Sequence, residues 1–380
     1  MAGTGVPGVE DVAGLASWLR AQELPGLQGL PGRLPGVTMI AGGRSNLTYR
    51  LDLGDGQGGD GPGDGPGAGA RLVLRRPPLG HVLPTAHDMA REYRVLSALA
   101  DTAVPVPRPL AFCEDQSVIG SPFYLMEWVD GAVLRSRDDA AAITPAQAGH
   151  LSERFIDMLA TIHGIDVPAV GLAGFGRPEG YLARQLARWQ RQWDLSATRE
   201  MPGYAELVAR LDAGLPAPGG ASPPDTGEQA GGQTGALVHG DFRIDNMLVT
   251  LAAEPTIAAV VDWEMSTLGD PLADLGLTLV YWTNPGEQDP LELTRDGGLT
   301  ATPGFWTRAQ LAERYARATG RDVSTLGYYM AFGCFKLAVV LEGIHARFLQ
   351  HKTVGEGFER QGEAVPILIA RAHRLLDGDS

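Results

Sequence analysis

Residues 236–249 read ALVHGDFRIDNMLV, and residues 257–264 read IAAVVDWE. The HGDFRIDN portion is polar, and the apolar residues on either side of it are typical of short buried strands. A third apolar run ends directly at Asp262, which predicts a strand that delivers this carboxylate beside the polar loop. The chain is therefore expected to hold a loop of charged and amide side chains between buried strands.

The spacing of residues within this loop indicates its chemistry. Four residues separate Asp241 from Asn246, as in a kinase catalytic loop, where the Asp orients a substrate hydroxyl and accepts its proton while the Asn binds Mg²⁺. Asp262 would add a second hard oxygen ligand, and Mg²⁺ completes its shell with water and phosphate oxygens. Arg243 lies two residues beyond Asp241, where a cation can stabilise a transferring phosphoryl group or bind an acidic substrate. An ordinary polar turn between two strands is the alternative interpretation.

Three further polar residues are predicted to support the loop rather than to react. His239 precedes Asp241 by two positions, where its ring can pack under the loop and hydrogen-bond to backbone. In GDPLADLG, residues 269–276, Asp270 is placed to cap a helix that begins with a proline. Asp270 and Asp274 are both expected to hold the loop in place.

The motifs HGDFRIDN, VVDWE and GDPLADLG resemble those of the aminoglycoside phosphotransferase and choline kinase family of small-molecule kinases. The resemblance is closest to the kinase-like domains related to those fused to acyl-CoA dehydrogenases, and it extends from about Val37 onward. It implies an α+β, two-lobed protein-kinase-like fold. The N-lobe, residues 1–130 with the hinge, would have an antiparallel sheet with one helix, and the C-lobe, residues 131–380, would be mostly helical. The resemblance further implies that ATP is held between the lobes and that an alcohol is phosphorylated over Asp241.

Upstream residues fit the nucleotide-binding part of such a fold. VTMIA at residues 37–41 and LTYRLDL at residues 47–53 predict two strands joined by a glycine-containing turn, whose backbone N–H groups can face phosphates. We expect nucleotide contacts in this turn from Gly43, Ser45 and Asn46. A plain hairpin turn is an equally good interpretation of these residues by themselves.

A buried ion pair is predicted between a strand and a helix. LVLRR at residues 72–76 continues the sheet and delivers Arg75, rather than Arg76, where related kinases carry a lysine that binds the α- and β-phosphates. Glu92 lies on the apolar face of the helix predicted at residues 87–99, and an inward charge needs a partner, which Arg75 supplies. The alternatives are a surface strand end for the arginine and a glutamate at the edge of the apolar face.

The hinge between the lobes is assigned by resemblance to SPFYLMEWVDG, residues 121–131. Backbone groups of Glu127 and Val129 are then the expected adenine contacts, because backbone at an edge can recognise a flat base. From its residues alone, the segment is simply a buried strand that ends at a glycine turn.

Most of the remaining chain is predicted to be helical. Helices are expected at residues 145–162, 181–195, 205–213 and 326–348. The last of these is long and apolar, and its polar residues could line the acceptor pocket, although a solvated face is the interpretation that the pattern favours. These polar residues are Lys336, Glu342, His345 and Arg347.

Composition limits the partners and the location of the chain. Its 380 residues suffice for two lobes, and the formal charge of −14 argues against nucleic acid and anionic membrane surfaces as partners. Only two cysteines occur, the N-terminus has no basic region followed by an apolar core, and no apolar run reads as long enough to cross a bilayer, so a cytoplasmic protein is expected. Two glycine-rich segments, residues 54–69 and 214–235, cannot build a core and are expected to be loops.

The leading hypothesis is an ATP- and Mg²⁺-dependent phosphotransferase that acts on a hydroxyl of a small metabolite. The resemblance suggests a hydroxy acid or hydroxyacyl compound as acceptor, whereas the wider family includes kinases for aminoglycosides and amino alcohols. One alternative is a nucleotide-binding pseudokinase or regulatory module, against which the joint presence of Asp241, Asn246 and Asp262 argues. Another is a metal-dependent phosphoesterase, which would need more grouped His or Asn ligands. The sequence leaves the acceptor, the choice between ATP and GTP and the oligomeric state open.

Overall fold

The chain divides into two compact units, Met1–Asp130 and Gly131–Ser380, named here the first and the second unit. The computed structural model describes residues 6–22, 36–40, 46–53, 71–79, 88–216, 235–285, 287, 298–351, 358 and 360–378. Gly43 and Ser45, the glycine-rich segment 54–69 and most of the segment 214–235 lie outside the described residues.

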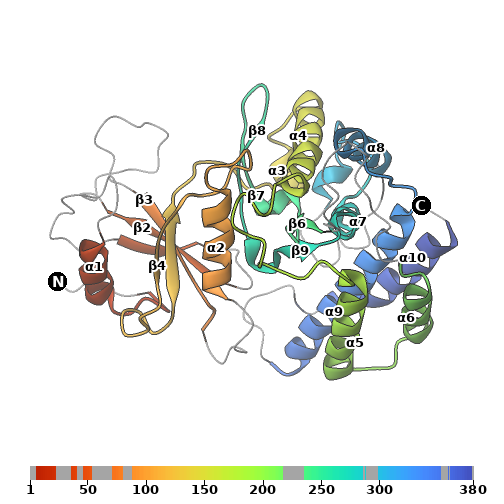
Figure 1. Ribbon diagram of the computed structural model, residues 1–380, viewed down its shortest axis with the longest axis horizontal. Coiled ribbons are helices and arrows are strands. Elements are labelled where there is room, and N and C mark those ends of the chain that lie inside the picture. The colour runs from red at the N-terminus through yellow and green to blue at the C-terminus, as the bar shows by residue number, and fades with distance from the viewer. Residues whose placement is uncertain are drawn as a thin grey trace. The chain divides into compact units, whose positions relative to one another are not determined.

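The first unit is built on a five-stranded antiparallel sheet with the strand order β1-β2-β3-β5-β4 (Figure 1). Its strands are β1 (Gly36–Met39), β2 (Leu47–Asp52), β3 (Arg71–Arg76), β4 (Pro109–Cys113) and β5 (Phe123–Glu127). The helices of this unit are α1 (Val12–Ala21) and α2 (Met89–Leu99). The sequence predicted α2 and the other four strands, but it indicated neither α1 nor β4.

The two helices of the first unit cover opposite faces of its sheet, as Figure 1 also shows. Leu15 and Leu19 of α1 belong to a cluster of buried apolar residues on one face. On the other face, Tyr93 of α2 stacks on Phe112 with 5.5 Å between the ring centroids. The strand residues of the cluster on the α1 face are Tyr49, Leu51, Leu72, Leu74, Ala111, Cys113, Phe123 and Leu125.

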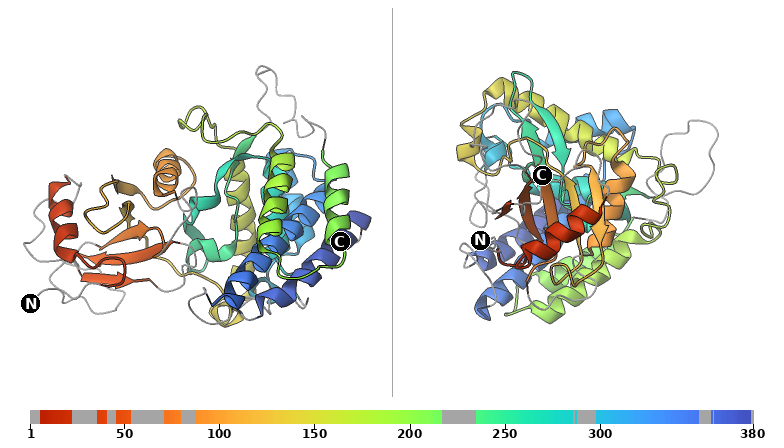
Figure 2. Two further views of the ribbon diagram at one scale, coloured as in Figure 1. Left: turned by 90° about the horizontal axis from the view of Figure 1, so that it is seen from below. Right: turned by 90° about the vertical axis from the view of Figure 1, so that its left-hand side faces the viewer.

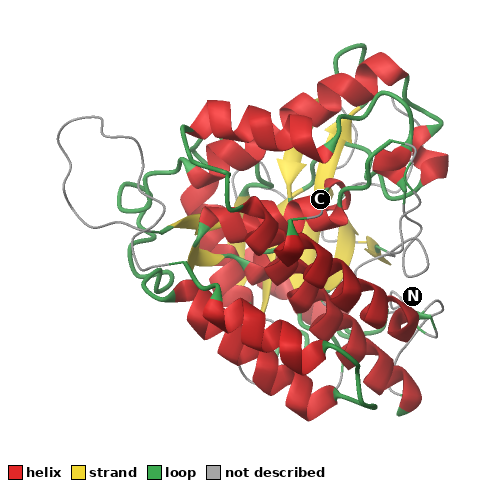
Figure 3. Cartoon of the chain, turned by 90° about the vertical axis from the view of Figure 1, so that its right-hand side faces the viewer, coloured by secondary structure: helices red, strands yellow, loops and turns green. Residues whose placement is uncertain are grey.

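The second unit is mostly helical and contains two small antiparallel sheets, β6 with β9 and β7 with β8. Its strands are β6 (Ala236–Val238), β7 (Met247–Thr250), β8 (Thr256–Val260) and β9 (Thr267–Gly269). Its α-helices are α3 (Arg137–Ala140), α4 (Pro145–His163), α5 (Tyr181–Ser196), α6 (Tyr204–Ala213), α7 (Pro271–Tyr281), α8 (Arg308–Thr319), α9 (Leu326–Leu349) and α10 (Ala364–Asp377). Short 3₁₀ turns are η1 (Ile244–Asn246), η2 (Trp263–Met265), η4 (Leu299–Ala301) and η5 (Gln361–Glu363). The helices lie around the short strands (Figures 2 and 3).

Helix α9 forms much of the core of the second unit. It packs against α7, α10 and α5. By length and composition its 24 residues could cross a membrane, but 72% of its apolar window is buried inside the protein. The expectation that no apolar run has that length was therefore wrong for α9, which carries only two charges, Lys336 and Glu342, before its last turn. A buried core helix can have the same length and apolarity, and the burial of α9 matches that role.

Candidate active site

Two strand pairs hold the polar loop formed by residues 239–246. The strand before it, β6, pairs with β9, and the strand after it, β7, pairs with β8. The Asn246 carbonyl accepts a hydrogen bond from the Val261 N–H at 3.0 Å, so Asp262 follows directly beside Asn246. Asp262 has left-handed backbone angles, φ 69° and ψ 56°, a conformation that costs a non-glycine residue about 1–2 kcal/mol. The strand end predicted to bring Asp262 to the loop does so, although β8 stops one residue earlier than expected.

Asp274 of α7 anchors the beginning of the loop. Its carboxylate accepts the N–H of His239 at 2.7 Å and that of Gly240 at 2.9 Å, and His163 Nε2 lies 3.2 Å away. Burial alone would raise the pKa of Asp274, but its interactions with His163 and His239 lower this pKa below its ordinary value. The prediction that Asp274 holds the loop is confirmed.

The glycine of the loop is required by a close contact. Gly240 has φ +85°, and a Cβ at this position would lie 2.6 Å from the Met265 carbonyl oxygen. Only glycine combines this backbone angle with such a close approach. The loop can therefore pass close to η2 only because its second residue has no side chain.

His239 supports the loop from below, as predicted. Its side chain is fully buried, and its Nε2 lies 3.0 Å from the Val261 carbonyl oxygen. Nδ1 lies 3.3 Å from the Asp241 backbone nitrogen. Because Nδ1 accepts that N–H, Nε2 must carry the proton that is donated to Val261. The ring also lies 4.6 Å from the Trp263 ring, so His239 links the loop to the end of β8.

Asp241 lies at the centre of the loop with half-buried carboxylate oxygens. Asn246 Nδ2 is 3.3 Å from one of them, and the Tyr281 hydroxyl donates a further hydrogen bond. Burial favours the protonated acid, but the charges of Arg243 and Lys336 outweigh it and lower the pKa of Asp241. A carboxylate kept ionised in this way can accept a proton from a bound hydroxyl.

Arg243 lies among two carboxylates and an aromatic ring. It hydrogen-bonds to Asp245, its Nε is 3.7 Å from Asp241 Oδ2, and its guanidinium carbon is 5.2 Å from the centroid of the Tyr281 ring. Burial would lower the pKa of Arg243, but the charges of Asp241 and Asp245 raise it. Its buried Nη1 has no hydrogen-bond partner among the residues that the structure describes. Such an N–H donor is suited to a phosphate oxygen.

Asn246 and Asp262 fit a Mg²⁺ ion that takes its other ligands from water and phosphate. Asn246 Nδ2 donates a hydrogen bond to the Asp241 carbonyl oxygen at 2.8 Å, and this bond does not engage the side-chain oxygen that would be the metal ligand. The charge of Asp262 contributes to the raised pKa of Arg243, which shows that these two side chains are close. In the described ranges, no group of three or more His, Cys, Asp or Glu is placed to hold a metal.

The sequence did not assign Lys336 of α9 to the loop. Its ammonium group donates to the Gly240 carbonyl at 2.8 Å and lies 5.6 Å from the Trp189 ring centroid. Burial lowers the pKa of Lys336, and the charges of Asp241 and Asp274 partly oppose that effect. The solvated face favoured from the sequence was therefore wrong for this residue. The sequence did contain a signal for this contact. A single lysine in the middle of a long apolar helix is expected to be buried, and a buried cation needs a polar partner.

The other polar residues of α9 divide between the interior and the surface. Glu342 is fully buried and accepts hydrogen bonds from the Thr198 N–H at 3.0 Å and the Thr198 hydroxyl at 2.6 Å. His345 is half-buried, whereas Arg347 is exposed. The solvated-face interpretation thus holds for Arg347 and fails for Glu342, whose bonds tie α9 to the end of α5.

Asp270 caps α7 as predicted but does not hold the loop. Its carboxylate accepts the Leu272 N–H at 2.9 Å, and the Tyr329 hydroxyl donates to it at 2.9 Å. These bonds link the beginning of α7 to α9. The expectation that Asp270 would fix the loop was wrong, because its side chain is engaged at the helix terminus instead.

In the first unit, the predicted ion pair is present. Arg75 Nε lies 3.0 Å from Glu92 Oε2, and the two side chains are 11% and 2% exposed. The choice of Arg75 over Arg76 follows from the alternation of side chains along β3. Arg76 points to the α1 face, where its guanidinium donates to the carbonyls of Gly8 and, at 3.0 Å, Ile119. Of these two arginines, only Arg75 therefore faces α2.

The remaining candidates of the first unit lie at strand ends. Asn46 precedes β2 and is 2% exposed. The Glu127 N–H donates to the Arg108 carbonyl at 2.9 Å, which removes this donor from the predicted adenine contact. Val129 lies beyond β5, and within the described ranges its backbone makes no hydrogen bond. Of the two predicted adenine contacts, Val129 is therefore the one whose backbone groups are not engaged within the described residues.

Comparison with known structures places this architecture among the kinase-like phosphotransferases. A Ralstonia eutropha protein, provisionally assigned as an aminoglycoside phosphotransferase, superposes with a TM-score of 0.73 at 30% identity and covers 97% of this chain and 98% of its own. The aminoglycoside phosphotransferase APH(4)-Ia, determined with ADP and hygromycin B, matches with a TM-score of 0.52 at 12% identity over 91% of this chain and 94% of its own. The two-part, mixed α and β fold is thus a kinase-like fold.

The chain belongs to the phosphotransferase enzyme family, whose sequence pattern matches residues 36–322. Acyl-CoA dehydrogenase family member 11 from Gallus gallus is 36% identical over 331 residues, which are 86% of this chain and 38% of that relative. The chain therefore spans well under half of the length of this curated relative. The resemblance found in the sequence motifs is confirmed.

Proposed function

We propose that this protein is an ATP- and Mg²⁺-dependent phosphotransferase that transfers the γ-phosphoryl group to a hydroxyl of a small metabolite. The observation that carries the proposal is the arrangement around Asp241. This carboxylate is kept ionised although it is partly buried, and Arg243 beside it has a buried N–H without a partner among the described residues. A base next to an unused cationic donor is the combination that phosphoryl transfer needs.

The proposed step uses these two residues directly. Asp241 accepts the proton of the acceptor hydroxyl, and the oxygen forms a bond to the γ-phosphorus while the bond from that phosphorus to the β-phosphate oxygen breaks. ADP carries away the electron pair of the broken bond. Arg243 donates to the transferring group, whose equatorial oxygens carry the charge. Bound Mg²⁺ would neutralise phosphate charge, with Asn246 and Asp262 as its protein ligands.

The buried ion pair of the first unit supports a nucleotide substrate. Arg75 presents a permanently charged fork that can bind phosphate oxygens in a bidentate manner, and Glu92 fixes the side chain from behind. Nucleotide use is also supported by the bound ADP of the structural relative APH(4)-Ia. We propose ATP as the donor on this basis.

The acceptor is proposed from the relatives and from the charge of the site. The similarity to acyl-CoA dehydrogenase family member 11 favours a hydroxy acid or hydroxyacyl compound. Lys336 and Arg243 place positive charge near Asp241, and Arg188 lies near Lys336, which suits an acidic acceptor. An aminoglycoside, suggested by the structural relatives, or an amino alcohol, suggested by the resemblance of the motifs to choline kinases, is the alternative acceptor class.

The proposal is tested by a phosphotransfer screen. Mg·ATP is offered with hydroxy acids, hydroxyacyl-CoA thioesters, amino alcohols and aminoglycosides, and ADP release and the phosphorylated product are both measured. Asp241→Asn should lower kcat by about 10²–10⁴-fold, because the general base is lost. Asp262→Asn should lower activity and raise the Mg²⁺ concentration required. Asp212→Asn, on the exposed face of α6, is the matched control and should behave as the wild type.

Two outcomes would replace the proposal. Nucleotide binding without phosphorylation of any acceptor or of water would identify a pseudokinase. Metal-dependent release of phosphate from monoesters in the absence of ATP would identify a phosphoesterase.

A further inference from the structure

Tyr281, the last residue of α7, contacts both reacting groups of the loop. Its phenol donates a hydrogen bond to the Asp241 carboxylate. Its ring lies under the Arg243 guanidinium, 5.2 Å from the guanidinium carbon. Burial, and then the charge of Asp241, raise the pKa of Tyr281 well above its ordinary value, so the phenol remains a donor. One side chain thus touches the base and the cation at the same time.

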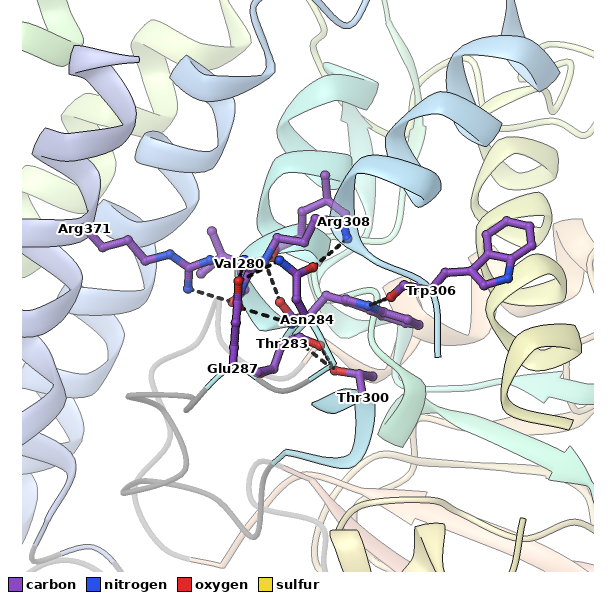
Figure 4. Close-up of polar contacts among 10 residues, drawn as sticks. Val280, Thr283, Asn284, Glu287, Thr300, Trp306, Arg308 and Arg371 are labelled. Carbon is purple, nitrogen blue, oxygen red and sulfur yellow. Dashed lines mark hydrogen bonds and ion pairs between the residues drawn. The ribbon is translucent and has the colours of Figure 1, made fainter. Parts of the chain in front are cut away.

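The end of α7 is fixed by two arginines from other helices (Figure 4). Arg308 of α8 donates through Nε to two carbonyl oxygens around the last turn, at 3.1 and 2.7 Å. Arg371 of α10 donates to a third carbonyl at 3.3 Å. These carbonyls belong to Leu279, Trp282 and Val280. Cations at the C-terminal end of a helix satisfy its open carbonyls and its dipole, so the backbone that carries Tyr281 is held from outside α7.

The residues that follow Tyr281 are held as well. Arg308 forms an ion pair with Glu287 at 2.8 Å, and its backbone N–H donates to the Asn284 side chain at 2.8 Å. The Thr283 N–H donates to the Thr300 hydroxyl at 2.9 Å. Figure 4 shows these groups converging just beyond α7. The chain is therefore anchored on both sides of Tyr281, and the ring is presented to the loop from a backbone that these contacts hold.

We propose that Tyr281 is a positioning residue for phosphoryl transfer. Its hydroxyl fixes the rotation of the Asp241 carboxylate, and its ring fixes the plane of the Arg243 guanidinium, so the base and the phosphate-binding cation keep a constant separation. A cation over an aromatic face is attracted by the ring quadrupole, and small displacements of reacting groups cost rate steeply. This proposal rests on the function proposed above.

Two substitutions separate the two contacts. Tyr281→Phe removes the hydroxyl and keeps the ring under Arg243, whereas Tyr281→Leu removes both. Tyr329→Phe is the matched control, because it removes another phenol-to-aspartate hydrogen bond of the second unit, 2.9 Å long, that involves neither Asp241 nor Arg243. For each variant we would measure kcat and the KM for ATP with the best acceptor of the screen, or with water, and the dissociation constants of Mg·AMP-PNP and Mg·ADP.

Tyr281→Phe should lower kcat about ten- to a hundredfold and leave both the KM for ATP and the ratio of the two dissociation constants unchanged. Tyr281→Leu should in addition lose the tighter binding of AMP-PNP relative to ADP, because Arg243 no longer meets the γ-phosphate. The proposal is overturned if Tyr281→Phe keeps kcat within twofold, if Tyr329→Phe loses as much, or if Tyr281→Leu keeps the binding ratio. A wild type that binds AMP-PNP but transfers nothing would refute only the proposed function, and the binding ratio would still decide the role of the ring.

Discussion

At the scale of single residues, Asp274 does the most to keep the loop in its conformation. It accepts two consecutive backbone N–H groups, from His239 and Gly240, and contacts His163. Both N–H groups would otherwise be buried without partners, and each such group costs about 1–3 kcal/mol. His163 is in turn held by the Tyr315 hydroxyl at 2.7 Å. The loop geometry therefore depends on a carboxylate that does not take part in the proposed reaction.

Asp274→Asn tests this dependence and its pH profile. The pKa of Asp274 is lower in the folded protein than its ordinary value, so its ionisation contributes stability above about pH 4, and this contribution is lost as the pH falls through the folded pKa. The wild type should lose stability below about pH 4, and the variant should lack that component while being destabilised at pH 7 by about 2–4 kcal/mol. Urea unfolding at pH 7, 5 and 3.5 measures both effects, and an acid limb of equal size in both proteins would contradict the assignment.

Charge balance around Asp241 also operates at the residue scale. Burial opposes its ionisation, and two cations from different elements, Arg243 of the loop and Lys336 of α9, restore it. Lys336 is itself held by the Gly240 carbonyl. The proton affinity of the proposed base therefore depends in part on Lys336, which lies 95 residues further along the chain.

At the scale of elements, α7 and α9 approach each other closely, and glycines allow it. A Cβ on Gly276 of α7 would lie 2.6 Å from the Tyr329 carbonyl carbon, and a Cβ on Gly333 of α9 would lie 3.1 Å from the Leu277 Cα. Helices α7 and α9 carry Tyr281 and Lys336, which reach Asp241 from different elements. The helix packing thus sets the distance between the two groups that flank the proposed base.

Gly276→Ala should therefore destabilise the protein and lower phosphotransfer. Because the added methyl group meets backbone rather than a flexible side chain, we expect a loss of about 1–3 kcal/mol in the free energy of unfolding. Gly149→Ala in α4 is the control, since a Cβ there lies 3.5 Å from its nearest neighbour, and alanine should stabilise that helix by up to about 1 kcal/mol. Denaturant unfolding and ADP release compare the two variants. A stability of Gly276→Ala equal to that of the wild type would refute the close-packing argument.

The sequence predicted the elements that have a strong periodic pattern or a clear cap. Helix α4 begins at Pro145, as the sequence predicted, and α2 buries Glu92 on its apolar face as expected. By contrast, β4 begins with a proline and contains a bulge, and it has no alternating pattern to reveal it. Helices α1, α8 and α10 were not recognised. Which of their residues are buried is decided by the surfaces against which they pack, and these surfaces are known only from the structure.

The residues of the candidate site also fall into those that the sequence could place and those that it could not. Asp241, Arg243 and Asn246 lie within one short motif, so their proximity could be inferred from spacing. Tyr281 and Lys336 reach the loop from helices distant in sequence, and tertiary packing alone brings them there. The alternation of side chains along β3 is a stronger reason to select Arg75 over Arg76. Leu72, Leu74 and Arg76 share the face that packs against α1, so Arg75 lies on the opposite face.

At the scale of the whole molecule, the two units carry different parts of the proposed chemistry. The first unit holds the buried pair of Arg75 and Glu92, and the second holds Asp241 with its supporting residues. Substitution of Arg75 should therefore change nucleotide affinity, and substitution of Asp241 should change the rate of transfer. This separation can be tested without knowing the acceptor.

Arg75→Met should weaken Mg·AMP-PNP binding about ten- to a hundredfold, since a charged hydrogen bond contributes about 1.5–3 kcal/mol. Asp241→Asn should bind this nucleotide as the wild type does. Because Arg75→Met leaves Glu92 buried without its partner, it should also lose about 3–5 kcal/mol of stability. The double variant Arg75→Met with Glu92→Leu should recover much of that stability without recovering the affinity.

Arg71→Met on the same strand is the matched control, because Arg71 pairs with Asp130 at a side-chain exposure of 36% and 69%. Isothermal titration with Mg·AMP-PNP and urea unfolding of all variants separate affinity from stability. Equal losses of affinity in Arg71→Met and Arg75→Met would show a general effect of positive charge on the strand. A double variant that regained affinity together with stability would show that Arg75 acts only as a structural partner of Glu92. Loss of affinity that persists in the stable double variant would assign phosphate binding to Arg75, because lost stability would no longer account for it.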